Sequence, residues 1–526
     1  MNTTKKMLSV LLTAAMALSI TACTGGETSG QGGNGSDGGT TTTSGTFAEA
    51  TAPPIDETAE TGTIKYFTYE TSFTTDSAKM IGLFKERYNG EIDVQTGASS
   101  LNYFEMLGTR IATGDSPDLI RFEQMAFPHG MSYNMFTPLD SYIDLDSELW
   151  VGMKDTAEQY AYNGKHFYVP YVNVPYFALN YNNRVLEENG MPDPMQYVKD
   201  GTWDWDKFEE MLRRWMDIDP AEYIAYNGVS ALPFAYTTGV KIIDIKDGQI
   251  INNLRNEDIV RCMEKLEGWR KNHLTGASPE QLAAGRNNGY THPADAFVDG
   301  KLLFLGMDPM WTYGAAKEAL DGKSIPNEMK FIPFPRDPNK DKWYQCTSTY
   351  GYMIPAGAQN VKGAVDWITL LRIEETDPEN IATAKDKACA DVPAYRVKCG
   401  ECGHYFTYQE DEDLIDTCPD CGTPRNTMYK VVWTEEQWDM YQELVFDNEK
   451  YTFMYDNLYG FSTDFKNLFV DSNDNLLTGV MFNDLSYTQR VEEIWGAVEG
   501  YLQPYRDRME ADARGEEVTT TPPEEA

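Results

Sequence analysis

The sequence is poor in positive charge. Its 526 residues include 44 lysines and arginines against 82 aspartates and glutamates, which gives a formal net charge of −38 at pH 7. A protein that follows a nucleic-acid backbone needs the opposite sign, because it must neutralise phosphates. We therefore exclude nucleic acid as a partner and expect an acidic, well-solvated surface.

Long apolar stretches are almost absent. One run, residues 7–20, follows Lys5 and Lys6 and is too short to span a bilayer comfortably. The positive start, the apolar run and the small residues after it indicate a secretory signal over 1–23. Its end resembles a bacterial lipobox, in which Cys23 would be cut free and acylated. An ordinary signal peptide cut near the same place is the alternative. Acylation would anchor the protein at the outer face of the cell membrane, and we expect a Gram-positive bacterium as its source.

Cysteines are few and unevenly placed. Of the eight, one ends the signal segment and four form two C-x-x-C hooks late in the chain. The others, Cys262, Cys346 and Cys389, are an odd number in apolar or mixed surroundings, which is unlike a disulfide framework. We expect them to be buried or free thiols.

The two ends of the chain differ in composition from its middle. Residues 24–62 are mostly small and polar and predict a disordered tether, and 506–526 predict an acidic tail. The middle is rich in aromatic and aliphatic residues, enough for a large core in more than one lobe.

Strand and helix patterns alternate at the start of this middle part. Residues 63–70 and 91–97 predict strands, 74–90 predicts a helix, and 101–124 predicts a helix, a turn and a strand. Such alternation indicates parallel βαβ units and therefore an α/β lobe.

Further motifs follow in a fixed order along the chain. They are RIATGDSPDLI (110–120), FTPLDSYID (136–144), NGKHFYVPY (163–171), ALNYNNRVLEENGMPDP (178–194), WDWDKFEEMLRR (203–214), AFVDGKLLFLGMDPMW (296–311), TYGYMIPAGAQNVKGAVDWITLL (349–371) and YTQRVEEIWGAVEGYLQPY (487–505). Together they resemble family 1 extracellular solute-binding proteins, the capture subunits of ABC sugar importers.

The resemblance implies a two-lobed, periplasmic-binding-protein-like α/β fold of type II, with a ligand held between hinge-linked lobes. The N-terminal lobe would take residues 63–172 and 307–350, and the C-terminal lobe 173–306 and 351–505. The family pattern has no counterpart of residues 396–430, which we interpret as an insertion in the second lobe.

The insertion contains the most specific chemical motif of the chain. Cys399 and Cys402 form one hook, Cys418 and Cys421 form the other, and a glycine follows each hook. Four thiolates bind a metal tetrahedrally at about 2.3 Å, and a C-x-x-C turn presents two of them together. The glycine allows the turn a positive φ. The pair resembles a zinc ribbon or a rubredoxin-like knuckle pair, so we expect structural Zn. Fe in the same ligand set and two disulfides are the alternatives.

Ligands of open parallel sheets bind beyond the carboxyl ends of the strands. This rule selects Tyr69 and Glu70 after the first strand, and Glu123 and Gln124 after the third. The family resemblance adds Trp311, where relatives stack a sugar ring, and Asp308 beside it. The remaining candidates lie near the predicted lobe crossings: Tyr171, Trp343 and Tyr350. Core packing is the alternative for each aromatic residue, and a solvated surface position for each carboxylate.

We therefore expect a membrane-anchored protein that captures a carbohydrate, most simply an oligosaccharide, and delivers it to an ABC permease. We name no catalytic residue, since neither H-E-x-x-H nor G-x-S-x-G occurs. Two alternatives stay open. One is a surface glycoside-active enzyme, whose paired carboxylates such an acidic sequence does not exclude. The other is an adhesion or assembly lipoprotein that has lost its ligand and docks through the metal ribbon.

Overall fold

The computed structural model describes most of the chain after residue 60. The described residues are 61–97, 99, 102–229, 231–275, 296–297, 300–309, 329–389, 395–399, 405–408, 417–419, 421–422, 428–430, 434–470 and 475–516. At 395–399, 405–408 and 428–430 the description covers the backbone. The predicted signal segment, Cys23 and nearly all of the predicted tether lie outside these residues.

The first lobe is built on a four-stranded sheet with the order β12–β3–β1–β2. Strands β1, β2 and β3 are parallel, and β12 is antiparallel to β3. The strands are β1 (Gly62–Phe67), β2 (Gly90–Gln95), β3 (Leu119–Arg121) and β12 (Tyr352–Met353). Helices α3 (Ala78–Tyr88) and α4 (Tyr103–Thr113) connect the parallel strands. The predicted alternation of strands and helices is therefore confirmed here.

The second lobe is built on the sheet β10–β5–β9–β6. Only β6 and β9 are parallel among its neighbouring strands. The strands are β5 (Ala178–Asn182), β6 (Ile224–Gly228), β9 (Leu302–Met307) and β10 (Met329–Ile332). Helix α9 (Trp205–Met216) begins at Asp204, whose side chain accepts from two backbone N–H groups of the first turn. Its buried face recurs with helical spacing from Trp205 to Trp215, so the helix packs on this lobe's core.

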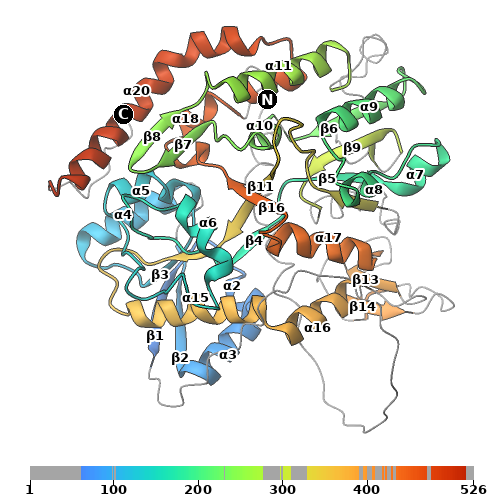
Figure 1. The fold of residues 1–526 in the computed structure, drawn as a ribbon. Coiled ribbons are helices and arrows are strands. Elements are labelled where there is room, and N and C mark those ends of the chain that lie inside the picture. The colour runs from blue at the N-terminus through green and yellow to red at the C-terminus, as the bar shows by residue number, and fades with distance from the viewer. Residues whose placement is uncertain are drawn as a thin grey trace.

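A three-stranded sheet with the order β16–β11–β4 lies between the two lobes (Figure 1). Its strands are β4 (Val172–Val174), β11 (Trp343–Tyr350) and β16 (Tyr451–Tyr455). The first part of β11 pairs parallel with β16, and its last three residues pair antiparallel with β4. The three strands are therefore the crossing connections between the lobes.

Strand pairing corrects the lobe boundaries predicted from the sequence. Strand β10 was expected in the first lobe but pairs with β5 of the second. Strand β12 and helix α15 (Val361–Thr376) were expected in the second lobe, but β12 pairs with β3, and α15 packs on β1 and α3. A short strand can join either sheet by local pattern alone, and only the available edge decides which.

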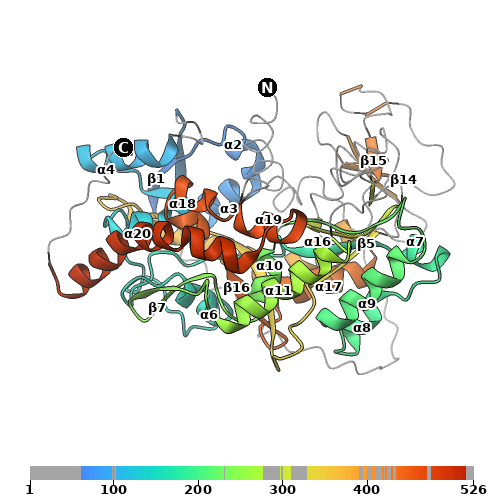
Figure 2. The ribbon, with the colours of Figure 1, turned by 90° about the horizontal axis from the view of Figure 1, so that it is seen from above.

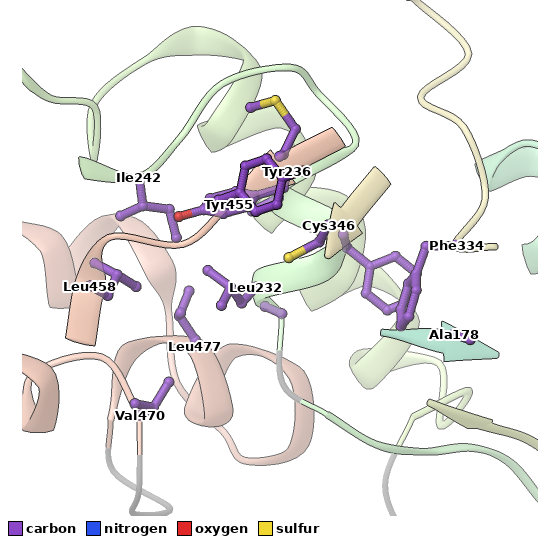
Figure 3. Close-up of a cluster of buried hydrophobic side chains, with 14 of the residues drawn as sticks. Ala178, Leu232, Tyr236, Ile242, Phe334, Cys346, Tyr455, Leu458, Val470 and Leu477 are labelled. Carbon is purple, nitrogen blue, oxygen red and sulfur yellow. The ribbon is translucent and has the colours of Figure 1, made fainter. Parts of the chain in front are cut away.

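A large buried cluster fills the second lobe and continues through the crossing sheet into the first lobe. Figure 3 shows Cys346 of β11 between Leu232 of α10 (Leu232–Tyr236) and Phe334, with Tyr455 of β16 nearby. Cys262 and Cys346 are buried free thiols and Cys389 is half-buried. The expectation of free or buried thiols is confirmed for these three cysteines.

The chain ends in a long helix, α20 (Tyr487–Ala513), which runs along one side of the molecule (Figure 2). The predicted acidic tail therefore starts too early, because the helix continues past residue 506. In the part of the chain that the structure describes, no helix is both long enough and apolar enough to span a membrane.

The remaining elements complete both lobes and the insertion. They are α2 (Phe73–Asp76), η2 (Gln124–Ala126), α5 (His129–Ser132), η3 (Val151–Met153), α6 (Lys154–Gln159), α7 (Asn183–Glu188), α8 (Pro194–Lys199), β7 (Ile243–Lys246), β8 (Gln249–Asn252), α11 (Glu257–Lys271), α16 (Pro378–Ala388), β13 (Tyr395–Cys399), β14 (Tyr405–Tyr408), β15 (Met428–Lys430), α17 (Glu435–Phe446), η5 (Leu458–Gly460), α18 (Thr463–Asn467) and α19 (Leu476–Phe482).

One buried carboxylate joins the early and late parts of the first lobe. Asp118, only 2% exposed, accepts from Lys65 N at 2.9 Å and from the backbone N–H groups of Gln359 and Asn360 at 2.8 Å each. It thereby ties β1 to the start of α15. Asp118 lies within the motif RIATGDSPDLI. The three hydrogen bonds that it accepts explain why the motif has an aspartate at this position.

The variant Asp118→Ala leaves three backbone donors without their acceptor. Lys65 and Asn360 are half-buried, whereas Gln359 is exposed and its N–H can bind water. Each buried unsatisfied donor costs roughly 1–3 kcal/mol, so we expect the free energy of unfolding to fall by at least about 2 kcal/mol. Urea unfolding measures this change. Asp115→Ala is the matched control, since Asp115 is an exposed partner of Arg110 at 3.1 Å and its loss should cost less than about 1 kcal/mol. Equal losses in the two variants would contradict the assignment.

Candidate functional site

A cavity of about 180 Å³ lies where the first lobe meets the segment that follows β16. Both sides contribute aromatic and polar side chains. The lining residues are Tyr103, Phe104, Glu123, Gln124 and Met125 from the first lobe, and Tyr459, Ser462, Thr463 and Lys466 from the later segment. The lining part of this segment consists of η5 and α18, and its η5 contacts η2 of the first lobe. The segment continues into α19, which contacts α11 of the second lobe. Glu123 and Gln124, two of the predicted ligand residues, are therefore at a cavity between the lobes.

The two walls approach closely because one of them has a glycine at the contact. A Cβ atom added to Gly460 would lie 1.7 Å from the carbonyl oxygen of Phe127, which no side chain tolerates. Phe127 follows η2 and Gly460 ends η5. The glycine thus lets η5, which carries Tyr459, pack closely against η2, which carries Gln124, and both residues line the cavity.

A charged cluster lies at the carboxyl ends of β1 and β3. Arg121 forms an ion pair with Glu70 and has Glu123 at 3.8 Å. The hydroxyl of Tyr69 hydrogen bonds to Glu123. The side chains of Arg121, Glu70 and Glu123 are 17%, 15% and 25% exposed. Tyr69, Glu70 and Glu123 were selected because they follow strand ends, and in the structure they lie in one cluster.

Burial and charge oppose each other within this cluster. Burial raises the pKa of Glu123, and the neighbouring Arg121 guanidinium counteracts part of that rise. Burial would lower the pKa of Arg121, but Glu123 and Glu70 together hold it above its ordinary value. One cation is therefore shared by two carboxylates, and Glu123 is the more exposed of the two.

A second group of side chains lies near the end of β11. Burial raises the pKa of Tyr350, Asp308 adds to that rise, and Arg121 acts against it. Tyr350 is therefore within electrostatic reach of Asp308, which follows β9 of the second lobe, and of Arg121 in the first. Burial and Asp308 also raise the pKa of Tyr176, which is 40% exposed. Tyr350 is thus close to charged groups of both lobes, while neither Tyr350 nor Asp308 is among the residues that line the cavity.

Other predicted ligand residues are placed elsewhere. Tyr171 is buried in the first-lobe core, and its carbonyl accepts from Arg372 at 2.9 Å. Trp343 is also buried, and its indole N–H donates to the carbonyl of Phe334 at 3.0 Å. Both have the environment of packing residues, so we leave them out of the candidate site. Trp311 lies outside the described residues.

The sequence did not single out several residues of this region. Arg121 precedes the predicted Glu123 by two positions. Opposite charges two positions apart at the end of a strand could have identified Arg121 from the sequence. Tyr176 follows a crossing strand by two residues. Tyr459 and Lys466 have no local signal, because the chain alone does not show which distant segment faces η2.

The insertion contains a small antiparallel sheet with the order β14–β13–β15. Among the described strands, these three pair only with one another. The sheet includes Cys399 as the last residue of β13. Cys389 precedes the insertion and Thr434 follows it, and the carbonyl of Thr434 accepts from the half-buried Cys389 thiol at 3.6 Å. The segments that flank the insertion therefore meet, as expected for a module set into a surface loop.

The second hook has the local shape expected of a knuckle. Gly422 has a φ of +70°, and its N–H donates to the carbonyl of Cys418 at 2.9 Å. Cys418 is buried and Cys421 is exposed. Cys402 lies outside the described residues, as does the side chain of Cys399. Within the described part of the chain, no group of three or more potential metal ligands is found.

Comparison with known proteins identifies the family. The model of the bacterial extracellular solute-binding protein family matches residues 79–386, more than half of the chain. The chain belongs to this family, whose members are binding proteins. A search of curated protein sequences finds no match.

Two solved structures have a similar fold. The extracellular solute-binding protein from Staphylococcus aureus in complex with maltose has a TM-score of 0.55 and 12% identity, over 86% of this chain and 99% of that chain. The sugar-binding protein MalE from Xanthomonas citri has a TM-score of 0.56 and 14% identity, over 85% of this chain and 99% of that chain. These likenesses confirm the mixed α/β fold of a solute-binding protein.

The shared cation predicts a pH-dependent effect of Arg121→Met. Without Arg121, buried Glu123 loses the positive charge that counteracts the effect of burial, so the pKa of this carboxyl rises further. A carboxyl whose folded pKa is raised contributes stability at low pH that is lost as the pH rises. We therefore expect a larger loss in melting temperature at pH 8 than at pH 5.

Differential scanning calorimetry at both pH values measures this difference. Arg110→Met is the control, because its carboxylate partner Asp115 is exposed to solvent. A loss for Arg121→Met that is the same at both pH values would show that the charge pairing is unimportant.

Proposed function

We propose that this protein captures a carbohydrate between its lobes and delivers it to the permease of an ABC importer. An oligosaccharide is the class of carbohydrate that we favour. The observation that carries this proposal is the cavity at the strand ends, lined from both sides by rings, carboxylate, amide and hydroxyl groups. Binding sites for small polar molecules combine such apolar walls with a few polar groups.

The lining suits a sugar chemically. Tyr103, Phe104 and Tyr459 offer ring surface to the C–H faces of a pyranose. Glu123 and Gln124 offer acceptors for hydroxyl groups, with Ser462 and Thr463 on the opposite wall. Solute-binding relatives that are themselves described with maltose or as sugar-binding support the same class.

The size of the cavity indicates that the lobes must move. Sites for drug-sized ligands span about 300–1,000 Å³, whereas this cavity holds about 180 Å³. An oligosaccharide therefore needs the lobes to separate before it enters and to close around it afterwards. The crossing strands β4, β11 and β16 are the connections about which such hinge motion takes place.

Attachment to the cell surface completes the proposal. Acylation of Cys23 would hold the binding lobes at the outer face of the membrane, beside the permease. The extracellular character of the family supports export. Removal of Cys23 would release the protein without changing its affinity for the solute.

Thermal unfolding of residues 63–516 against a panel of mono- and oligosaccharides tests capture. A ligand at one hundred times its dissociation constant adds about 2.7 kcal/mol of stability. We expect one glycan class to raise the melting temperature, Trp311→Ala to abolish the shift, and Glu123→Gln to weaken affinity by roughly tenfold, about 1.4 kcal/mol.

Glu105→Gln is the matched control, since Glu105 is an exposed residue of α4, the helix that carries Tyr103 and Phe104. No shift with any glycan would contradict carbohydrate capture and would favour another polar solute or the adhesion function. Cleaved product from a bound glycan would instead establish the glycoside-active enzyme.

We also propose that Cys399, Cys402, Cys418 and Cys421 hold one structural Zn ion. The positive φ of Gly422, the closed turn from Cys418 to Gly422 and the end of β13 at Cys399 support this ligand set. A module this small has little core of its own, so the metal would supply most of its folding free energy. Four thiolates leave no open position, and we assign the site no catalysis.

Elemental analysis of the purified chain tests the metal site. We expect about one Zn per chain, its loss in Cys418→Ser, and its retention in the control Cys389→Ser, which changes a thiol outside the hooks. Fe in place of Zn would correct the metal. Two disulfides, detected by mass after alkylation, would overturn the site.

A further inference from the structure

Helix α20 is fixed to the second lobe along its first turns. The hydroxyl of Tyr487 donates to the carbonyl of Leu254 at 2.8 Å. Arg255 pairs with Glu492 at 2.8 Å and stacks on the ring of Trp495, 3.7 Å from its centroid. These partners lie beside β8 and α11, so this part of the helix belongs to the second lobe.

Beyond Pro504 the same helix keeps a contact with β8, where Arg506 donates to the carbonyl of Ile250 at 2.9 Å, and it is also bound to the first lobe. The side-chain amide of Asn163 donates to the carbonyl of Met509 at 3.1 Å and to the carboxylate of Asp512 at 2.8 Å. The guanidinium of Arg508 lies 3.8 Å from the ring centroid of Tyr133. The ring of Tyr133 lies 4.9 Å from that of His129, in α5 of the first lobe. Helix α20 therefore bridges the two lobes.

One residue of the bridge touches both walls of the cavity region. The hydroxyl of Tyr505 lies 2.8 Å from Nδ1 of His129, in α5 of the first lobe, and donates to the carbonyl of Phe461 at 2.7 Å. Figures 1 and 2 both show α20 passing close to α18, and α20 also contacts α5.

Each partner of Tyr505 is next to a residue that lines the cavity. Phe461 precedes Ser462 in the chain, and the ring of His129 lies 5.9 Å from that of Phe104. A single hydroxyl thus joins the two cavity walls just outside the cavity.

The proton arrangement follows from these contacts. Since Tyr505 donates its proton to Phe461, the Nδ1–H group of His129 must donate to the oxygen of Tyr505. Burial, together with the positive charge of Arg508, lowers the pKa of His129 to about 4, so its ring is neutral at pH 7. A neutral ring suffices for this chain of two hydrogen bonds.

We propose that Tyr505 is a positioning residue of the solute site, which holds the two cavity walls together and so favours the closed form of the protein. This inference rests on the proposed function for its biological meaning. We call the two hydrogen bonds from His129 to Tyr505 and from Tyr505 to Phe461 the tie. Separation of the walls breaks at least one of these bonds, so the tie favours closure and slows release of a bound solute.

Hydrogen exchange of the full mature chain without any solute tests the tie. In Tyr505→Phe, which keeps the ring and removes the hydroxyl, we expect amides of 124–133 and 456–466 to exchange about 2- to 10-fold faster. Amides of β1 and β3 should be unchanged. Tyr501→Phe is the matched control, because it removes a hydroxyl from the same helix one turn earlier, where the ring contacts Phe465.

A second variant separates a tie from a general packing role. His129→Phe keeps a ring beside Phe104 and removes the other hydrogen-bonding partner. If the hydroxyl acts through His129, the double variant should exchange no faster than the faster single variant. Unchanged exchange, or equal acceleration throughout both lobes, would overturn the proposal.

Solute release gives an independent measurement. With maltose as the probe, we expect dissociation from Tyr505→Phe to be about 2- to 10-fold faster than from Tyr501→Phe, with similar association. If neither variant binds maltose, maltose is the wrong sugar, and the hydrogen-exchange experiment still tests the hydrogen bonds of Tyr505. Equal dissociation rates for the two variants would overturn the role in solute retention.

Discussion

Strand β11 is the part of the structure on which both lobes depend. A strand has two edges, and β11 uses one for β16 along its first residues and the other for β4 along its last. The chain segments that enter and leave the lobes are thereby held in one sheet. Its last residue, Tyr350, is near both Asp308 and Arg121. The strand that connects the lobes therefore ends close to the charged cluster at the carboxyl ends of β1 and β3.

The charges of the site follow from its position at strand ends. Parallel strands β1 and β3 finish at one edge, which brings Glu70, Arg121 and Glu123 together with the Tyr69 hydroxyl. Because two carboxylates share a single guanidinium, the cluster is satisfied and still offers acceptor oxygen towards the cavity. This arrangement is compatible with the hydroxyl-rich solute proposed above.

The lobes are joined on a second side by the final helix. The crossing sheet connects the lobes on one side, and α20 bridges them on another through Tyr505, Arg508 and Asp512. In the proposed mechanism the first connection is the hinge, and the second acts against opening. Solute affinity then depends on contacts in the cavity and also on the balance between open and closed forms.

Local pattern by itself determined much of this protein: the α/β alternation near the start, the strand ends with Tyr69, Glu70, Glu123 and Gln124, and the turn glycine after Cys421. These features depend on residues close in the chain, whose periodicity and caps are visible in one dimension. Only the tertiary structure decided which sheet accepts β10 and β12, that Tyr171 and Trp343 are packed in the core, and that Lys466 and Tyr505 lie beside residues of the first lobe. Those outcomes depend on which distant surfaces bury one another, and burial is a property of the whole fold.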